Sequence, residues 1–470
     1  KLKMGLKGKW WWMLIVVIMG IRYEASGCLD QERAALLELK ALFNVQYDGY
    51  EGKDCCKGWA GVTCGSNGRV SSLSFPGYLK ANLHFNASLL LHFQELRELY
   101  LSDNYILSWG EAHLSMKLSS CLTKLEVLDL SGSYIENSVL GKLSEFQSLK
   151  RLVLRGNSLT GHIQLNDFPG FHNLEELGLS ENRVDSLGIR NGSMSWSTGL
   201  TNLEVLDLGG NMLNSSILPN LRSLQSLKHL VLRMNKLEGQ IEVQDIEAIK
   251  NLEVLDLSYN FITGFVNNDG CGQMQKLRQL DLHQNKLGML PSCFRGLTAL
   301  MQLDLSQNQF TGGIPPCLQN LTNLQKVVQN LKLDSKVDED TSSTSENRAD
   351  FTAKGTVYSY SGTVLSYMSG LDLSCNRLTG KIPLELGNLS NLHALNLSHN
   401  DLWGSIPASL SKMKQIESLD LSYNSLTGHI PTELVVLTAL EVFSVAHNRL
   451  SGEVPSKAQF ATFDAGSYEG

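Results

Sequence analysis

The sequence has few of the features that mark nucleic-acid-binding proteins, membrane-spanning proteins or enzymes. Its net charge is −7 and no basic run follows Lys1–Lys9, so the charge pattern gives no reason to expect nucleic acid as a partner. The longest apolar run, Trp10–Ile21, has 12 residues, fewer than the roughly 18 to 20 that a membrane-spanning helix needs. The motifs G-x-x-x-x-G-K-[ST], G-x-S-x-G and H-E-x-x-H do not occur. We therefore predict no enzyme activity, no metal and no cofactor.

The amino terminus has the three-part pattern of a secretory signal. Four lysines in Lys1–Lys9 precede the apolar run, and small residues follow at Ala25–Gly27. We predict that residues 1–25 form a signal peptide and that the remaining chain enters the secretory pathway. The alternative is an uncleaved anchor or a buried helix.

Four of the nine cysteines lie close together near this end, and export favours disulfides. The adjacent Cys55 and Cys56 fit the ligand spacing of a zinc site poorly. We predict the bridges Cys28–Cys55 and Cys56–Cys64. Between the first two cysteines, the apolar spacing of Gln31–Leu42 predicts an amphipathic helix.

The five later cysteines leave their pairing open. Cys293 and Cys317 both lie seven residues before the first Leu of a repeat, so they are candidates for a bridge between stacked repeats. Cys271 competes for Cys293. With Cys121 and Cys375 also present, the odd total leaves at least one free thiol.

A repeat of the form Leu-x-x-Leu-x-Leu-x-x-Asn dominates the chain. Its Asn position recurs at steps of 29, 24, 25, 29, 24, 25, 25, 23, 68, 24, 24 and 24 residues. The positions are Asn104, Ser133, Asn157, Asn182, Asn211, Asn235, Asn260, Asn285, Asn308, Asn376, Asn400, Asn424 and Asn448. A weaker copy at Val70–Phe75 gives about fourteen repeats.

Each repeat predicts a short strand followed by a turn and an apolar return segment. The leucines alternate with polar residues, as in a strand with one buried face, and a single copy cannot bury that face alone. Stacked copies form a parallel sheet, so the chain is a solenoid. The recurrent Asn is expected to be buried and to satisfy backbone groups where the strand ends. The later return segments read Leu-x-Gly-x-Ile-Pro. Gly allows the backbone to bend, and Pro interrupts the backbone hydrogen bonding because it has no N–H to donate.

The segment DCCKGWAGVTC, the LTGxIP returns and the copy ESLDLSYNSLTG together resemble the extracellular region of plant leucine-rich-repeat receptor-like proteins. The resemblance implies an α/β leucine-rich-repeat solenoid of the plant-specific type, a curved right-handed superhelix with a parallel sheet on its concave face. It also implies a receptor without a kinase of its own, at the extracellular face of the plasma membrane. The family continues beyond Gly470 into a second cysteine cap, an acidic segment, a membrane helix and a basic tail. We therefore expect the sequence to be a fragment or a soluble remnant.

The repeats and the resemblance divide the chain into six expected segments. They are the signal peptide at 1–25, a disulfide-bonded cap at 26–66, about ten repeats at 67–330, an insertion at 331–367, four repeats at 368–456, and the start of an incomplete cap at 457–470.

The insertion explains the step of 68 residues. We expect Asn320–Leu333 to be a decayed repeat and Asp334–Asp350, which is rich in acidic residues, to be a solvated loop. The run that follows resembles the insertion that the family calls the island, including a Lys-x5-Tyr signature at Lys354 and Tyr360. With Tyr358, these residues are candidates for binding a ligand or co-receptor. The alternative is a linker whose aromatic residues seal the adjoining repeat.

Recognition is expected on the concave face, at the variable positions of the strands before the insertion. The candidates are Arg97, Glu98, Tyr100, Lys150, Arg151, Arg155, Lys228, His229, Arg233, Tyr259, Arg278 and His283. Mixed charge and aromatic residues suit a peptide or protein ligand. The repeats after the insertion are close to the family consensus, and the resemblance implies that they contact shared co-receptor kinases. The candidates there are Ser418, Asp420, Ser422, Tyr423 and His447.

Aspartates recur between the two strand leucines, at Asp207, Asp256, Asp281, Asp304, Asp372 and Asp420. Neighbours would lie about 5 Å apart, which resembles a retaining glycosidase pair. We expect instead that they belong to the repeat consensus and face open solvent, where nothing raises the pKa of a carboxylate.

Six N-x-[ST] sequons predict a glycoprotein, at Asn86, Asn191, Asn214, Asn320, Asn388 and Asn396. Asn396 lies on a predicted strand and is the one expected to stay unmodified.

Two functions fit these features. The first is a receptor ectodomain that binds an extracellular peptide, protein or oligosaccharide and signals through partner receptor kinases in defence or development. The second is a secreted inhibitor or decoy like the plant polygalacturonase-inhibitor proteins, which share the cap and repeat but have about ten repeats and no island. The repeat count and the insertion favour the receptor.

Overall fold

The computed structural model describes residues 28–43, 54–77, 87–104, 106, 112–164, 173–188, 200–266, 274–289, 297–321, 348–353, 356–361 and 369–470. The predicted signal peptide lies outside these residues. Within them, none of the helices combines the length and the apolar character needed to cross a bilayer. The chain forms two compact units, one from Lys1–Ser158 with Phe168–Leu174 and one from Leu159–Asp167 with Glu175–Gly470.

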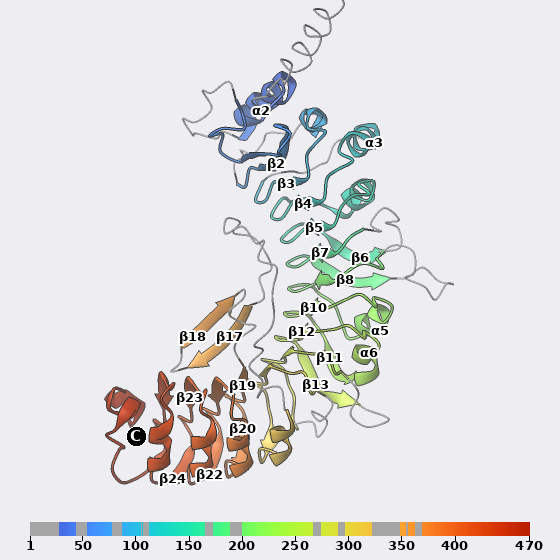
Figure 1. The fold of residues 1–470 in the computed structure, drawn as a ribbon. Coiled ribbons are helices and arrows are strands. Elements are labelled where there is room, and N and C mark those ends of the chain that lie inside the picture. Colours follow the sequence, from blue (N-terminus) through green and yellow to red (C-terminus); the bar gives the residue numbers. More distant parts are fainter. Residues whose placement is uncertain are drawn as a thin grey trace, which may run out of the picture. The chain divides into compact units, whose positions relative to one another are not determined.

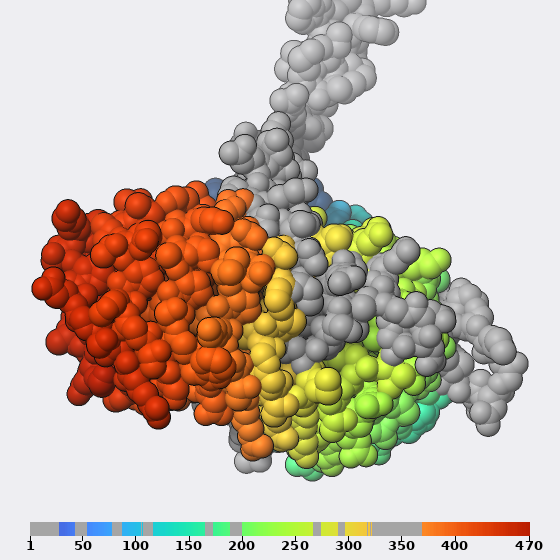
Figure 2. Space-filling view, turned by 90° about the horizontal axis from the view of Figure 1, so that it is seen from below, coloured from blue at the N-terminus to red at the C-terminus, as the bar shows by residue number. Residues whose placement is uncertain are grey.

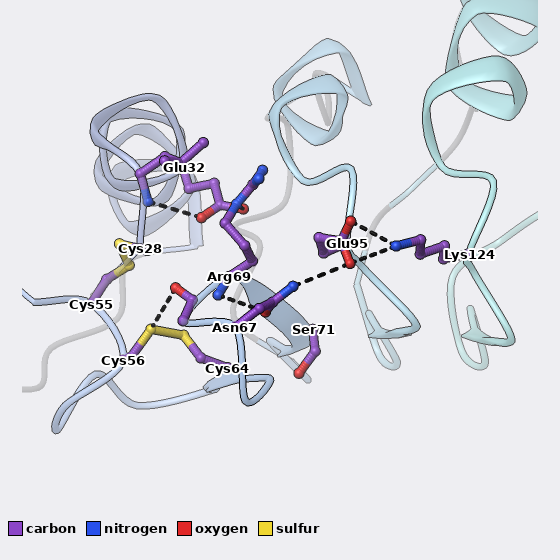
Figure 3. Close-up of polar contacts among 12 residues, drawn as sticks. Cys28, Glu32, Cys55, Cys56, Cys64, Asn67, Arg69, Ser71, Glu95 and Lys124 are labelled. Carbon is purple, nitrogen blue, oxygen red and sulfur yellow. Dashed lines mark hydrogen bonds and ion pairs between the residues drawn. A yellow bond between two sulfur atoms is a disulfide. The ribbon is translucent and has the colours of Figure 1, made fainter. Parts of the chain in front are cut away.

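The first unit begins with the predicted disulfide-bonded segment (Figure 3). Helix α2, Asp30–Phe43, matches the predicted amphipathic helix, and the bridges Cys28–Cys55 and Cys56–Cys64 are both formed. Glu32 of α2 is fully buried and accepts a hydrogen bond from Nε of Arg69 at 2.9 Å. This ion pair joins the helix to the residue that immediately precedes the first repeat strand.

The part of the main sheet in the first unit has five strands, of which β2 to β5 are labelled in Figure 1. They are β1 Val62–Cys64, β2 Val70–Ser74, β3 Glu98–Tyr100, β4 Val127–Asp129 and β5 Arg151–Val153. β1 pairs antiparallel with β2, and the remaining neighbours pair in parallel. The helices and helical turns on the return segments are η2 Ala87–His92, α3 Ala112–Cys121, η3 Asn137–Val139 and α4 Leu140–Leu143.

The main sheet of the second unit continues the same pattern with parallel strands. They are β7 Glu176–Gly178, β9 Val205–Asp207, β10 His229–Val231, β12 Val254–Asp256, β14 Gln279–Asp281, β15 Gln302–Asp304, β19 Gly370–Asp372, β21 Ala394–Asn396, β23 Ser418–Asp420 and β25 Val442–Ser444. The buried central residue of each strand pairs with that of the next, as Leu230 does with Leu255. With β2 to β5, these strands account for the fourteen predicted repeats.

The buried Asn side chains perform the predicted task. Nδ2 of Asn260 donates to the carbonyls of Leu232, Leu257 and Ser258, each at 3.0 Å, and its Oδ1 accepts the backbone N–H of Leu237 at 3.0 Å. Two of these partners belong to the preceding repeat, so each Asn also joins neighbouring repeats. The equivalent Asn residues in most other repeats make the same contacts.

A second set of strands, on the return segments, was not predicted. The pairs are β6 Thr160–Gln164 with β8 Arg183–Gly188 and β11 Glu238–Glu242 with β13 Phe261–Val266. A five-stranded sheet follows, made of β16 Thr311–Gly312, β20 Arg377–Gly380, β22 Asp401–Gly404, β24 Ser425–Gly428 and β26 Arg449–Leu450. We call this sheet the return sheet.

Short helices complete the repeats of the second unit. They are α5 Ile217–Leu221, α6 Val243–Glu247, η6 Pro316–Asn320, η9 Leu384–Asn388, η10 Ala408–Lys412 and η11 Thr432–Val436. The prolines of the Leu-x-Gly-x-Ile-Pro segments cap the last four of these at their amino ends, with Pro383 at φ −63° before η9 as an example. A fixed φ near this value and the absence of an N–H suit that position.

The insertion leaves the main sheet continuous. β15 pairs directly with β19, with Leu303 opposite Leu371. Residues 322–333 of the predicted decayed repeat lie outside the described residues. Figure 2 shows the orange surface after the insertion adjoining the yellow surface of residues 297–321. Within the insertion, β17 Arg348–Ala353 and β18 Thr356–Ser361 form an antiparallel hairpin. The expected loop therefore ends before residue 348, because residues 348–350 belong to β17.

The carboxyl-terminal residues cover the last repeat. The turns η12 Ala458–Ala461 and η13 Ala465–Ser467 bring Phe460 and Tyr468 against Phe443 of β25, with ring centroids 4.9 and 5.9 Å away. The backbone N–H groups of Val445 and His447 donate to the carbonyls of Ser467 and Glu469. These contacts occupy donors that would otherwise pair with a further repeat.

Candidate functional site

The exposed face of the main sheet brings the predicted recognition residues into rows that run across the strands. Neighbouring strands are in register, so equivalent residues of adjacent repeats lie about 5 Å apart. The charged row begins one residue before each strand. In the first unit Glu126 lies between Arg97 and Lys150 and pairs with both, with Nζ of Lys150 at 3.0 Å. The hydrogen bond from Lys150 is the main reason that the pKa of Glu126 is lowered.

The second unit has the same kind of row. Nζ of Lys228 lies 2.7 Å from the carboxylate of Glu204, and Nε of Arg278 lies 3.5 Å from that of Glu253. The side chains of Lys228 and Arg278 stay 42% and 45% exposed. Exposed ion pairs contribute little to stability, so these cations remain available to a partner that offers its own carboxylates.

The other predicted recognition residues differ in exposure. Tyr100 and Arg151 are half-buried, whereas Arg155 and Arg233 are exposed. Gly209 gives Arg233 room, because a Cβ at Gly209 would lie 3.1 Å from Cγ of Arg233.

Tyr259 and His283 lie together on neighbouring repeats. Their ring centroids are 5.0 Å apart in an edge-on arrangement, and Nδ1 of His283 lies 2.7 Å from Oγ of Ser306. His229, which lies in β10, is half-buried, and burial lowers the pKa of its imidazole. None of these contacts tests ligand binding, so the recognition residues remain predictions.

Two of the six repeated aspartates do not face open solvent, contrary to the sequence-based expectation. Asp372 and Asp420 are 1% and 3% exposed, whereas Asp207, Asp256, Asp281 and Asp304 are half-buried. Oδ1 of Asp420 accepts hydrogen bonds from the backbone N–H and the hydroxyl of Ser422, at 3.0 and 2.6 Å. The same Asp-x-Ser contact recurs at Asp256 and Ser258. The side chains therefore hold the backbone at the end of each strand.

Burial also changes the charge behaviour of these carboxyls. It raises the pKa of Asp256, and it raises the pKa of Asp372 well above its ordinary value, with the neighbouring Asp304 adding to the effect. Nδ2 of Asn396 donates to Oδ2 of Asp372 at 3.1 Å. The expectation that nothing raises these pKa values is therefore wrong.

The predicted co-receptor face divides into buried and exposed residues. Asp420 and Ser422 are buried and bonded to each other, which makes them poor contacts for a partner. Ser418 is half-buried. Tyr423 is 46% exposed and lies between two histidines, with ring centroids 4.1 Å from His399 and 4.1 Å from His447.

This aromatic stack was not predicted as a unit. Each of its residues directly precedes the recurrent Asn of its repeat and has φ between 51° and 55°. That left-handed conformation recurs at the equivalent position of many repeats, so the signal was present in the alignment of His399, Tyr423 and His447. The stack is the main exposed feature that sets this end of the sheet apart.

The hairpin of the insertion contains two of the three predicted island residues. Tyr358 is in register with Phe351, and Tyr360 with Ala349. Positions two apart on a strand lie on one face, so Tyr358 and Tyr360 share a face of the hairpin. Lys354 lies outside the described residues.

The sequons differ in their surroundings. Asn214 is exposed, and its Oδ1 accepts from the N–H and hydroxyl of Ser216. Nδ2 of Asn388 donates to Oε1 of Gln319 at 2.9 Å in an exposed contact. Asn396 is 6% exposed within β21, and the expectation that it carries no glycan stays a prediction. Asn86 and Asn191 lie outside the described residues, as does the side chain of Asn320.

The later cysteines are only partly described. Cys121 is a half-buried free thiol and Cys375 an exposed one, and burial is the main cause that raises the pKa of Cys375. Cys271, Cys293 and the side chain of Cys317 lie outside the described residues.

Comparisons with known proteins agree with this architecture. The leucine-rich-repeat family model matches residues 202–224, 251–272, 276–297, 299–321, 368–389, 391–413 and 415–437. Receptor-like protein 1 of Arabidopsis thaliana is 34% identical over 67% of the chain and 37% of its own length. Cuscuta receptor 1 of Solanum lycopersicum is 34% identical over 57% of the chain and 25% of its own length.

The chain thus spans well under half the length of these relatives. Among solved structures, a leucine-rich-repeat protein of Leptospira interrogans has a TM-score of 0.55, with 24% identity over 80% of the chain and 83% of its own. That likeness concerns the fold alone. The repeats and the sequence relatives together identify the chain as a leucine-rich-repeat protein that is related to the plant receptor-like proteins.

Proposed function

We propose that the chain is the ligand-recognition ectodomain of a plant cell-surface receptor-like protein and signals through partner receptor kinases. The observation that carries the proposal is a difference between two parts of the main sheet in the second unit. Before the insertion, the strands present ion-paired cations and the pair Tyr259 and His283. After it, the exposed feature is the aromatic stack of His399, Tyr423 and His447.

A varied surface suits a specific ligand, and a uniform one suits a partner shared by many receptors. Buried cores of interfaces are enriched in aromatic residues and arginine, and rims in other charged residues. The first part therefore fits an extracellular peptide, protein or oligosaccharide, and the second fits a kinase ectodomain. The aspartates have a structural task in this proposal, so it includes no catalytic activity.

Replacing Lys354 and Tyr360 by Ala tests the role of the insertion. We propose that both residues contact the ligand or co-receptor, so we expect weaker recovery of partner receptor kinases with normal secretion. Pull-down of the secreted variant from plant tissue, with quantification of co-purified kinases, measures this. Lys457→Ala in the carboxyl-terminal segment is the matched control. Unchanged recovery would remove the insertion from the site.

A further inference from the structure

The outward face of the return sheet carries a large exposed aromatic side chain at Trp403 in β22. Trp403 is 51% exposed, whereas Leu402 beside it is fully buried. The equivalent positions of the neighbouring repeats carry Thr379 and Thr427, which are small and polar. The repeat therefore does not require an indole at this position, and the exposed side chain is available for contact with a ligand.

Polar side chains surround the indole. Trp403 pairs with Ser425 of β24. On the other side, Thr379 and Gly380 of β20 pair with Asp401 and Leu402. The same register places the next residue, Lys381, beside Trp403. Nζ of Lys381 lies 5.5 Å from the centroid of the indole ring. Asp401, two residues before Trp403 in β22, lies on the same face of the strand, and Ser405 directly follows the strand.

Gly404 leaves space next to the indole because it has no side chain. Gly404 has φ +88°, and a Cβ there would lie 3.0 Å from Cγ of Lys381. The aliphatic part of Lys381 therefore occupies space that a larger residue at 404 would fill. With Lys381 in place, the indole still has half of its surface exposed, so a flat ligand can reach it.

We propose that this surface binds an oligosaccharide whose sugar rings carry carboxylates. A pyranose ring presents C–H groups on one face and hydroxyls around its edge. The indole offers a flat, electron-rich face for the C–H groups, and Ser405, Ser425 and Asp401 offer donors and acceptors for the hydroxyls.

Charge selects the acidic class of sugar. Arg377 begins β20 and Lys381 directly follows it, and neither has an ion pair among the described residues. Lys381 next to the indole would pair with a sugar carboxylate, and Asp401 lies two residues before Trp403. This site is on a different sheet from the proposed ligand face, and it stands whether or not that proposal holds.

Calorimetric titration of the full secreted chain with oligogalacturonate tests the inference. The fully methyl-esterified oligomer, titrated in parallel with a chelator present, is the uncharged match. We expect the wild-type chain to bind the acid form more tightly than the ester. Trp403→Thr, which installs the residue of the neighbouring repeats, should weaken both by about tenfold or more.

The cation is tested separately. Lys381→Gln should remove the preference for the acid form while retaining binding of the ester, and Lys414→Gln, an exposed lysine outside the return sheet, should change neither. Equal affinity of wild type and Trp403→Thr for the acid oligomer would overturn the site. If wild type binds neither sugar, the proposal of a carbohydrate ligand is overturned.

Discussion

At the scale of single residues, one side chain per repeat holds the turns together. Asn260 makes three donated hydrogen bonds and one accepted bond, all within 3.0 Å and all to backbone groups. The sequence predicted this role, because a buried amide at a fixed repeat position has few other uses. The burial of Asp372 and Asp420 was not predicted. It depends on neighbouring strands, such as that of Asn396 beside Asp372, and cannot be seen within a single repeat.

Asn260→Ala should loosen the repeat locally. The change leaves several buried backbone groups unpaired, and we expect a loss of at least about 2 kcal/mol in the free energy of unfolding. Hydrogen exchange at the amide of Leu237, which loses its acceptor, gives the local measurement. Asn260→Ser should be intermediate, because Ser133 fills the same position elsewhere and donates to the carbonyls of Leu101 and Ser131. Identical exchange in all three proteins would contradict the assigned role.

Asp372 predicts a specific dependence of stability on pH. Burial raises its folded-state pKa, so the folded protein holds a proton that the unfolded chain releases more readily. The stabilisation that this provides is complete below the unfolded pKa and is lost as pH rises through the folded pKa. We expect Asp372→Asn to gain stability relative to wild type as the pH rises from about 4 to 7. Thermal unfolding across that range, with the exposed Asp401→Asn as control, measures this. A constant difference would count against it.

At the scale of elements, the repeat pattern predicted the strands of the main sheet but missed the return sheet. The main strands carry two leucines in alternation, whereas β22 has a single buried apolar residue, Leu402, beside Gly404. A single apolar residue in the sequence does not distinguish a strand from a loop. The hairpin of β17 and β18 was not predicted. Residues 348–350 were assigned to a loop because of the charged residues around them, although they pair with β18. Helix α2 was predicted because its apolar spacing covers three turns.

The ion pair of α2 gives a prediction about the amino-terminal segment. Arg69→Met leaves the carboxylate of Glu32 buried without its cation, which we expect to cost about 3–5 kcal/mol and to expose α2 to protease. The double variant Glu32→Met with Arg69→Met should recover most of the loss, because it removes the buried charge as well. Urea unfolding compares the three proteins. Lys124→Met, which breaks the exposed pair with Glu95, is the control. A single variant as stable as wild type would refute the account.

At the scale of the whole molecule, the sequence predicted the number of repeats and the position of the insertion because the Asn step is nearly constant. The sequence did not distinguish residues that stabilise the repeat from exposed residues that can contact a partner. Asp420 and Ser422 were placed on a partner surface, and the structure buries both. Tyr423 and His447 remain exposed there, so the predicted contact with a partner kinase depends on these two residues.

The central claim is that ligand recognition and kinase contact lie on different parts of the main sheet. Affinity purification of three secreted chains from plant tissue, with quantitative mass spectrometry, tests it most directly. The chains are wild type, a variant with Arg233, Arg278 and His283 changed to Ala, and a variant with Tyr423 and His447 changed to Ala. We predict that the first variant loses the extracellular ligand and keeps receptor kinases in its absence, and that the second loses the kinases and keeps the ligand. Loss of both partners to the same extent in both variants, or recovery of no receptor kinase by wild type, would contradict the claim.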